Sequence, residues 1–230
     1  MITRISSARI DERGKLVGGK AGDQTGREVS EQNFYLHSKG WFVLRPKSEE
    51  HAEKIAERMR TACNNQNIGY DQNQRLGVIK NGIDSKVKTE CDCSSLVRAC
   101  VKEATGKDPG NFNTSNEKGV LYATGLFEQV RTYNSMLPLY VGDILVTKTK
   151  GHTVIVTQGN QRENVVKYYP AYKGNSVSFV DALVTMGIKS TFENRTKIAA
   201  ANGYKNYSGT AQENTFLLKL LKNGKLKSVM

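Results

Sequence analysis

The chain has 230 residues and a formal net charge of +12. This length suits one catalytic domain and a small second module, and no apolar run approaches the roughly 20 residues that a membrane helix needs. The positive charge predicts an anionic partner. A nucleic acid, a teichoic acid or an acidic membrane surface would each satisfy it, so charge does not choose among them.

The first 45 residues are polar and contain several glycines, and they close with the strand-like run 41–44 ahead of Pro46. We expect them to wrap around a catalytic domain rather than to form a domain of their own. The first 30 residues hold no apolar stretch of the kind found in signal peptides, so we expect no secretory signal.

A first helix is predicted after Pro46. Ser48 followed by two glutamates is a helix-start signal with acidic residues in the first turn, and the helix runs toward Cys63. His51 lies in this charged run and His37 in a polar connection before it. We expect both histidines to be solvated surface residues.

A second helix is predicted to begin near Cys93. Apolar residues recur beyond it at the spacing of one buried helical face, namely Leu96, Val97, Cys100, Val101 and Ala104. Asp92 is then the N-cap, and Cys93 lies in the first turn. Unpaired backbone N–H groups and the helix dipole favour the thiolate there, which is the form that attacks carbonyl carbons.

A nucleophilic cysteine needs a base, and His152 is the best placed of the three histidines. It stands at the head of the second of three strand-like runs, after a short polar turn. The runs are 144–149, 153–158 and 165–169. Helices followed by antiparallel strands are typical of an α+β fold.

Three motifs carry a resemblance to known proteins. DCSSLV at 92–97, GDIL at 142–145 and GHTVIV at 151–156 resemble the NlpC-type cell-wall cysteine peptidases and the related CHAP amidases. The resemblance implies a papain-like core in which Cys93 attacks an amide of peptidoglycan and His152 is its base. Ser95 replaces a glycine of that pattern.

Cys91 is not part of the pattern and leaves open which thiol reacts, although helix phase and alignment favour Cys93. A zinc site made of Cys91, Cys93 and His152 is the competing interpretation. It lacks an evident fourth ligand and any paired Cys-x-x-Cys. The acyl-transfer chemistry requires no metal and no organic cofactor.

The resemblance also suggests supporting residues. The backbone N–H of Cys93 and the hydroxyl of Tyr70 are expected to meet the oxyanion, and we expect the motif neighbours Asp92, Ser94 and Gly151 to line the substrate site. In this family the residue that orients the histidine comes from the next strand. Asn164 is the predicted residue, and Gln158 and Asn160 are the alternatives.

The two ends of the chain resemble phage endolysins of the peptidase type. Residues 8–26 resemble the opening of such lysins, and the tail resembles their small wall-targeting module. We place the boundary between residues 1–174 and 175–230. From residue 176 onward eight lysines and arginines face three acidic residues. This basic tail is consistent with attraction to an anionic wall polymer such as teichoic acid.

The sequence therefore predicts a peptidoglycan hydrolase that waits in the host cytoplasm and then acts on the bacterial cell wall, with no specific nucleic-acid partner. Either the bond between sugar and L-alanine or one within the peptide stem would suit the same nucleophile. Two alternatives stay open: a non-catalytic wall-binding or polyanion-binding protein on a degenerate fold, and an acyltransferase on the same fold.

Overall fold

The computed structural model describes residues 2–23, 27–162 and 167–229. The chain divides into two compact units, Met1–Arg162 and Glu163–Met230, and each is described by itself. The boundary predicted after residue 174 falls inside the second unit, because Tyr169 and Tyr172 pack in that unit's core.

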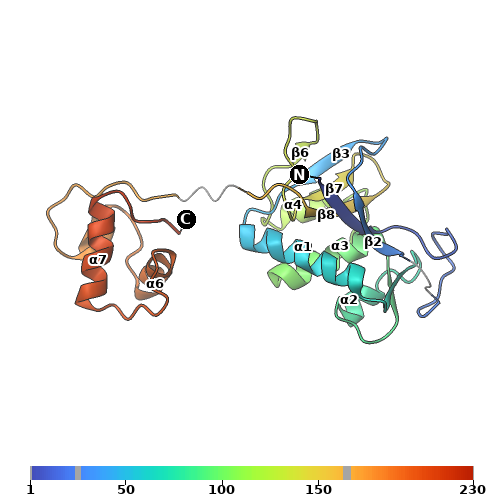
Figure 1. The fold of residues 1–230 in the computed structure, drawn as a ribbon, viewed down its shortest axis with the longest axis horizontal. Coiled ribbons are helices and arrows are strands. Elements are labelled where there is room, and N and C mark those ends of the chain that lie inside the picture. Colours follow the sequence, from blue (N-terminus) through green and yellow to red (C-terminus); the bar gives the residue numbers. More distant parts are fainter. Residues whose placement is uncertain (1, 24–26, 163–166, 230) are drawn as a thin grey trace. The chain divides into compact units, whose positions relative to one another are not determined.

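The first unit contains a six-stranded sheet in the order β2-β1-β8-β7-β3-β6, and the pairings are antiparallel. Figure 1 labels all of these strands except β1. The strands are β1 (Arg4–Ala8), β2 (Val29–Asn33), β3 (Trp41–Leu44), β6 (Arg131–Thr132), β7 (Ile144–Thr147) and β8 (Thr153–Gln158). A separate parallel pair joins β4 (Ile68–Tyr70) to β5 (Thr89–Cys91). Together with the helices, this sheet confirms the α+β class.

The expectation that the first 45 residues only wrap the domain is wrong. They supply β1, β2 and β3, and β1 pairs with both β2 and β8. The serines Ser6 and Ser7 hide β1 from a hydrophobicity pattern, but both are buried and both side chains hydrogen-bond to groups of the β8 segment. Buried hydroxyls are tolerated when they are paired in this way.

The strand predicted at 165–169 does not neighbour β8 in the described structure. Residues 165 and 166 lie outside the described residues, and Tyr168 makes only an isolated bridge to Lys227. The strand beside β8 is β1, which comes from the other end of the unit. This topology decides which residues surround His152.

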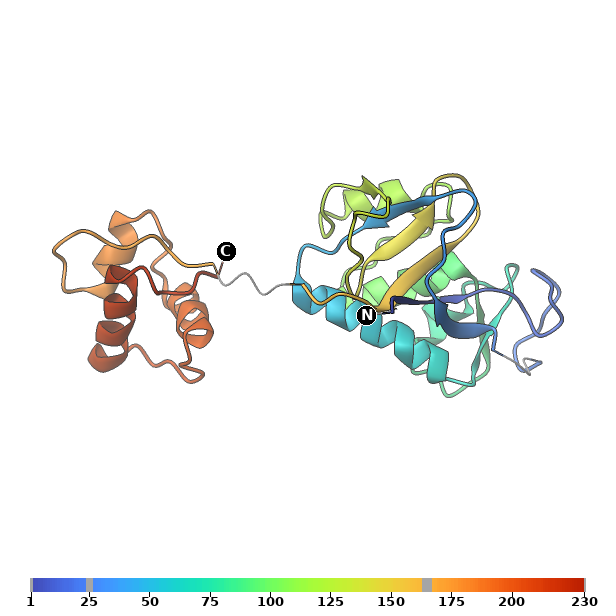
Figure 2. The same ribbon diagram turned by 45° about the horizontal axis from the view of Figure 1, so that its top comes forward.

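Of the helices of the first unit, the first, third and fourth contact the six-stranded sheet, whereas the second packs mainly on the third helix and on β5 (Figure 2). In order, the helices are α1 (Glu49–Asn64), α2 (Gly77–Asn81), α3 (Cys93–Thr105) and α4 (Glu117–Ala123). Ser48 caps α1 as predicted, accepting a hydrogen bond from the backbone N–H of His51. α1 and α3 pack directly on each other and on β1 and β8.

Two apolar clusters hold this unit together. The larger one joins the helices to the sheet through buried residues such as Ile55, Leu96 and Ile144. The smaller one covers the opposite sheet face with Ile5, Trp41 and their neighbours. Each large aliphatic side chain buried in this way contributes about 1.5–3 kcal/mol relative to exposure.

The second unit is a small helical module with its own core. Its helices are α5 (Phe179–Thr185), α6 (Phe192–Ala201) and α7 (Ala211–Lys222). α7 begins with a capping box between Thr210 and Glu213 and buries Leu217 and Leu221 completely. The separate core is consistent with an independently packed module.

Candidate active site

The start of α3 is fixed by Asp92. Its carboxylate accepts a hydrogen bond of 2.7 Å from the backbone N–H of Ser95, and the Ser95 hydroxyl in turn accepts one of 2.9 Å from the N–H of Asp92. This capping box confirms Asp92 as the N-cap. It also gives Ser95 a role, because a glycine there could not complete the box. Arg75 holds the other carboxylate oxygen.

Cys93 is the first residue of α3, and its side chain is 7 % exposed. The backbone N–H of Thr153 lies near enough to its sulfur to favour the thiolate, and the Ser94 hydroxyl lies 4.0 Å from that sulfur. Cys91 is different. It is fully buried, and its thiol donates to the Gly69 carbonyl at 3.3 Å, so it points into the core.

Burial keeps both proposed catalytic groups neutral. Desolvation, followed by the nearby carboxyls of Asp92 and Glu117, raises the pKa of Cys93 from its usual 9 to about 12. Desolvation, followed by the charges of His37 and Arg9, lowers the pKa of His152 to about 4. The pair is therefore a thiol and a neutral imidazole at pH 7.

The expectation that the helix start favours the thiolate is thus wrong for this protein. The rise in the Cys93 pKa corresponds to about 4 kcal/mol against ionisation. A helix terminus typically contributes about 0.3–1 kcal/mol in favour of a charge. Desolvation is the larger of the two effects.

His152 is positioned by the strands on both sides of it. Its backbone N–H donates to Thr147 Oγ1 at 2.9 Å, and its carbonyl accepts from the Thr147 N–H at 3.0 Å. Its ring nitrogen Nε2 is 3.1 Å from the hydroxyl oxygen of Ser7 on β1. Ser7 is therefore the polar group that engages the ring.

Neither of the two alternatives predicted to orient His152 lies beside it. Asn164 lies outside the described residues. Gln158 ends β8 and pairs with Arg4, which places it roughly 20 Å along the strand from His152. The Asn160 amide donates to the Leu139 carbonyl, so neither alternative reaches the imidazole.

Tyr70 precedes the motif that holds Cys93, and Gly151 begins the motif that holds His152. Tyr70 ends β4 and is 3 % exposed. Its hydroxyl accepts a hydrogen bond from Gln72 at 3.0 Å, and burial, with a smaller contribution from Cys93, raises its pKa. Gly151 donates to Thr114. A Cβ on Gly151 would lie 2.9 Å from Thr147 Oγ1, so a larger residue would disturb the turn that carries His152.

Glu117 is a buried carboxyl beside the nucleophile that the sequence did not reveal. It opens α4, it is fully buried, and it accepts a 2.6 Å hydrogen bond from the Thr153 hydroxyl. Its second oxygen has no hydrogen-bond partner among the described residues. Burial raises its pKa to about 8. The polar stretch around it resembles a solvated loop, so no local signal identified it.

His37 is not the solvated surface residue that the sequence suggested. Its ring packs edge-on to Trp41 at 5.3 Å and beside Tyr35 at 6.1 Å. His37 also contributes to lowering the pKa of His152, and Tyr35 lies within electrostatic range of Cys93. These three aromatic side chains form a group close to the proposed catalytic pair.

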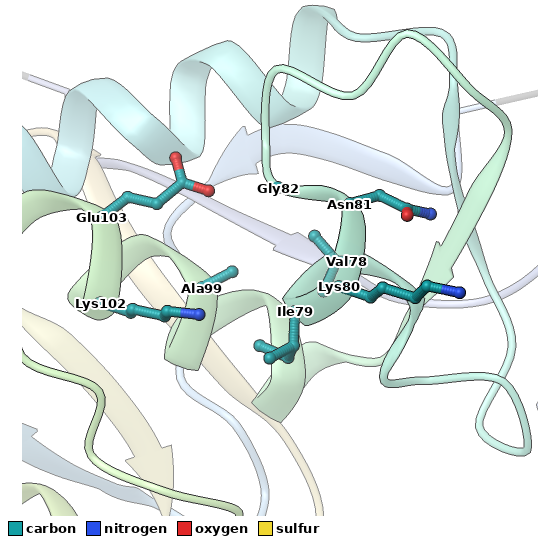
Figure 3. Close-up of a pocket in the computed structure, with 8 residues that line it drawn as sticks. All are labelled: Val78, Ile79, Lys80, Asn81, Gly82, Ala99, Lys102 and Glu103. Atoms are coloured by element: carbon teal, nitrogen blue, oxygen red, sulfur yellow. The ribbon is translucent and has the colours of Figure 1, made fainter.

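One pocket on α3 lies away from this region. Figure 3 shows it between α2 and the second half of α3, where Val78, Ala99 and Glu103 contribute to its lining. It encloses about 260 Å³. Ala99 is six residues beyond Cys93, about 9 Å along the helix axis, so this pocket does not contain the cysteine.

The zinc interpretation finds no matching geometry. The thiol of Cys91 is engaged by the Gly69 carbonyl within the core, so Cys91, Cys93 and His152 do not converge. Across residues 2–23, 27–162 and 167–229 no group of three or more histidines, cysteines or carboxylates is arranged to hold a metal ion. Within the same residues no helix is long and apolar enough to cross a membrane.

The sequence of the first unit matches the model of a known protein family. The model of the endolysin-like domain family matches residues 5–163, which is more than half of the chain, and the chain therefore belongs to that family. A relative from Listeria phage A118, named L-alanyl-D-glutamate peptidase, is 51 % identical over 51 residues.

That match covers 22 % of this chain and 18 % of the phage protein, so the similarity spans less than a fifth of the relative. No solved structure matches.

Proposed function

We propose that this protein is an endolysin that cleaves an amide bond of bacterial peptidoglycan, with Cys93 as the nucleophile and His152 as its base. The observation that carries the proposal is the placement of Cys93. It opens α3, and its sulfur is within electrostatic range of the backbone N–H of Thr153, the residue that follows His152 and begins β8.

The reaction begins from neutral partners. Ser7 occupies Nε2 of His152, which leaves Nδ1 to take the thiol proton as the sulfur attacks the substrate carbonyl. The C–N bond then breaks, and the imidazolium gives its proton to the leaving amine. Water, deprotonated by the same imidazole, hydrolyses the thioester and restores the thiol.

The oxyanion would be stabilised by two donors. The backbone N–H of Cys93 lies at the start of α3, where amide groups have no intrahelical partner. The Tyr70 hydroxyl accepts a hydrogen bond from Gln72, and its own proton remains available to donate. Loss of one such donor typically costs about 10²-fold or more in kcat.

Ser7 takes the positioning role that the sequence assigned to Asn164. In the tautomer with Nδ1 unprotonated, Nε2 carries the hydrogen and donates to the Ser7 oxygen, which holds the orientation of the ring. A serine is a weaker acceptor than a carboxylate, so it orients the imidazole without raising its pKa strongly. This is consistent with a base that stays neutral until attack.

The second unit is proposed to bind the cell wall. Its excess of lysines and arginines favours an anionic polymer such as teichoic acid. Full-length Cys93→Ala protein should sediment with purified walls, and extraction of the anionic polymers should weaken that binding. Undiminished binding to extracted walls would contradict the polymer assignment.

The catalytic proposal is tested on purified Gram-positive walls by turbidity loss and by release of amino groups. Wild type and Cys91→Ala should both cut, whereas Cys93→Ala and His152→Ala should not. Mass spectrometry of the fragments then identifies the bond, whether next to the sugar or within the stem. Binding without amine release would favour the non-catalytic alternative, and transfer to an added amine rather than water would indicate an acyltransferase.

A further inference from the structure

Arg9 is a cation without an acidic partner beside the proposed active site. Its Nη1 donates to Gln32 Oε1 at 2.6 Å, and its Nη2 donates to the Ser30 hydroxyl at 2.8 Å. Its Nε is buried and has no hydrogen-bond partner among the described residues. None of the ion pairs formed by those residues includes Arg9.

The position of Arg9 connects it to the catalytic groups. It follows β1 two residues after Ser7, which contacts His152. Its charge contributes to the low pKa of His152. It also acts on the Tyr35 hydroxyl, which is within range of Cys93. The guanidinium is therefore close enough to influence both sides of the site.

Two neutral partners hold the guanidinium in place without neutralising it. An arginine has five N–H donors, and two different nitrogens are used here. Fixing a half-buried cation without a counter-ion costs solvation energy. Such an arrangement is suited to an anion that arrives from outside, and the planar fork of arginine matches a carboxylate.

We propose that Arg9 binds a free carboxylate of the substrate. We identify it as the free carboxyl group of a stem-peptide glutamate, because the phage relative is named an L-alanyl-D-glutamate peptidase. The inference rests on the proposed function and adds a substrate preference to it: stems with a free glutamate carboxylate over stems in which it is amidated. Because the bound carboxylate neutralises Arg9, it also removes one charge that disfavours protonation of His152.

The test uses two stem-peptide substrates that differ only in this group, carboxylate or carboxamide. The kcat/KM values are measured with the full-length wild type, Arg9→Gln and Arg4→Gln. Arg4 is a matched control, because it lies on β1, the strand that Arg9 follows, and forms an ion pair with Glu31. Wild type and Arg4→Gln should prefer the carboxylate by about tenfold or more. Arg9→Gln should lose the preference, mainly through KM.

The outcomes separate this inference from the function on which it rests. Equal cleavage of both substrates by wild type, or a preference that survives in Arg9→Gln, overturns the role of Arg9 and leaves the hydrolase intact. No cleavage of either substrate or of whole walls overturns both.

A binding measurement guards against a folding defect in the variant. Calorimetry with the full-length Cys93→Ala protein should show tighter binding of the carboxylate peptide, and Cys93→Ala/Arg9→Lys should retain part of that difference because the charge remains. Equal affinities in the Cys93→Ala protein would count against the proposal.

Discussion

Asp143 and Glu90 are both buried carboxyl groups, and they differ in what surrounds them. Asp143 precedes β7 and receives two hydrogen bonds from Arg45, at 2.9 and 2.7 Å, and one of 3.0 Å from the Tyr140 N–H. Glu90 lies in β5 at 2 % exposure, and neither of its oxygens has a hydrogen-bond partner among the described residues. The first is half of an ion pair. The second is an acid surrounded by other acids.

The difference separates a carboxyl group that supports the fold from one whose protonation changes with pH. Gly142 and Asp143 belong to one of the motifs on which the resemblance to cell-wall peptidases was based, and in the structure both support the fold. Gly142 has a φ of 84°, and a Cβ there would lie 2.3 Å from the Ala52 carbonyl oxygen. Glu90 belongs to no motif. Burial and the neighbouring carboxyl of Glu28 raise its pKa to about 8, and burial raises that of Glu28 to about 7.

Breaking the paired site should have the largest effect. Arg45→Met leaves Asp143 buried and without its cation, which should lower the free energy of unfolding by about 3–5 kcal/mol. Urea denaturation measures this. Lys54→Met is the control, since it removes an exposed pair with Glu50 and should cost less than about 1 kcal/mol. Equal losses would mean that the buried ion pair of Arg45 and Asp143 contributes no more to stability than a surface ion pair.

The unpaired site should make stability depend on pH. Glu90 and Glu28 have folded-state pKa values above those of the unfolded chain, so the folded state binds more protons between about pH 4.5 and 8. Stability should be highest below that range and fall as the pH rises through it. Glu90→Gln should reduce the fall by on the order of a few kcal/mol. Parallel urea-derived stability curves for the two proteins would contradict this.

A smaller effect is expected where a neutral hydroxyl pairs with the base. Ser7→Ala should lower kcat about tenfold with little change in KM, because the His152 ring loses the partner of its Nε2. Ser7→Thr should restore part of the rate. Ser6→Ala removes the neighbouring buried hydroxyl, which pairs with Thr157 instead. If Ser6→Ala lowers kcat as much as Ser7→Ala, Ser7 has only a structural role.

The smallest effect should come from Glu117, the buried carboxyl group beside the proposed nucleophile. Glu117 ionises near pH 8, and its charge then adds to those that raise the pKa of Cys93. Wild-type kcat/KM should decline above pH 8, and Glu117→Gln should delay the decline, giving a few-fold advantage at pH 9. A pH profile of wall hydrolysis decides this, and superimposable alkaline limbs would contradict it.

Local signals in the sequence were enough to predict the helix and the strand that hold the residues of the proposed reaction. The apolar spacing after Cys93, the N-cap at Asp92 and the hairpin around His152 are short-range features, so the start of α3 and the position of β8 could be predicted. The α+β class followed from the order of helices and strands, and the endolysin resemblance followed from the two ends of the chain. The strand β1 escaped because its serines interrupt the hydrophobic pattern.

Only the tertiary structure decided what surrounds those residues. Ser7 reaches His152 across 145 positions of sequence, and strand pairing of that range leaves no local trace. The protonation of Cys93 was likewise beyond the sequence, because the helix dipole is a local property whereas desolvation depends on everything packed around the thiol. The sequence by itself determined the helix that carries Cys93, the proposed nucleophile; the three-dimensional packing decided which side chain contacts the His152 ring and how burial shifts the pKa of each group.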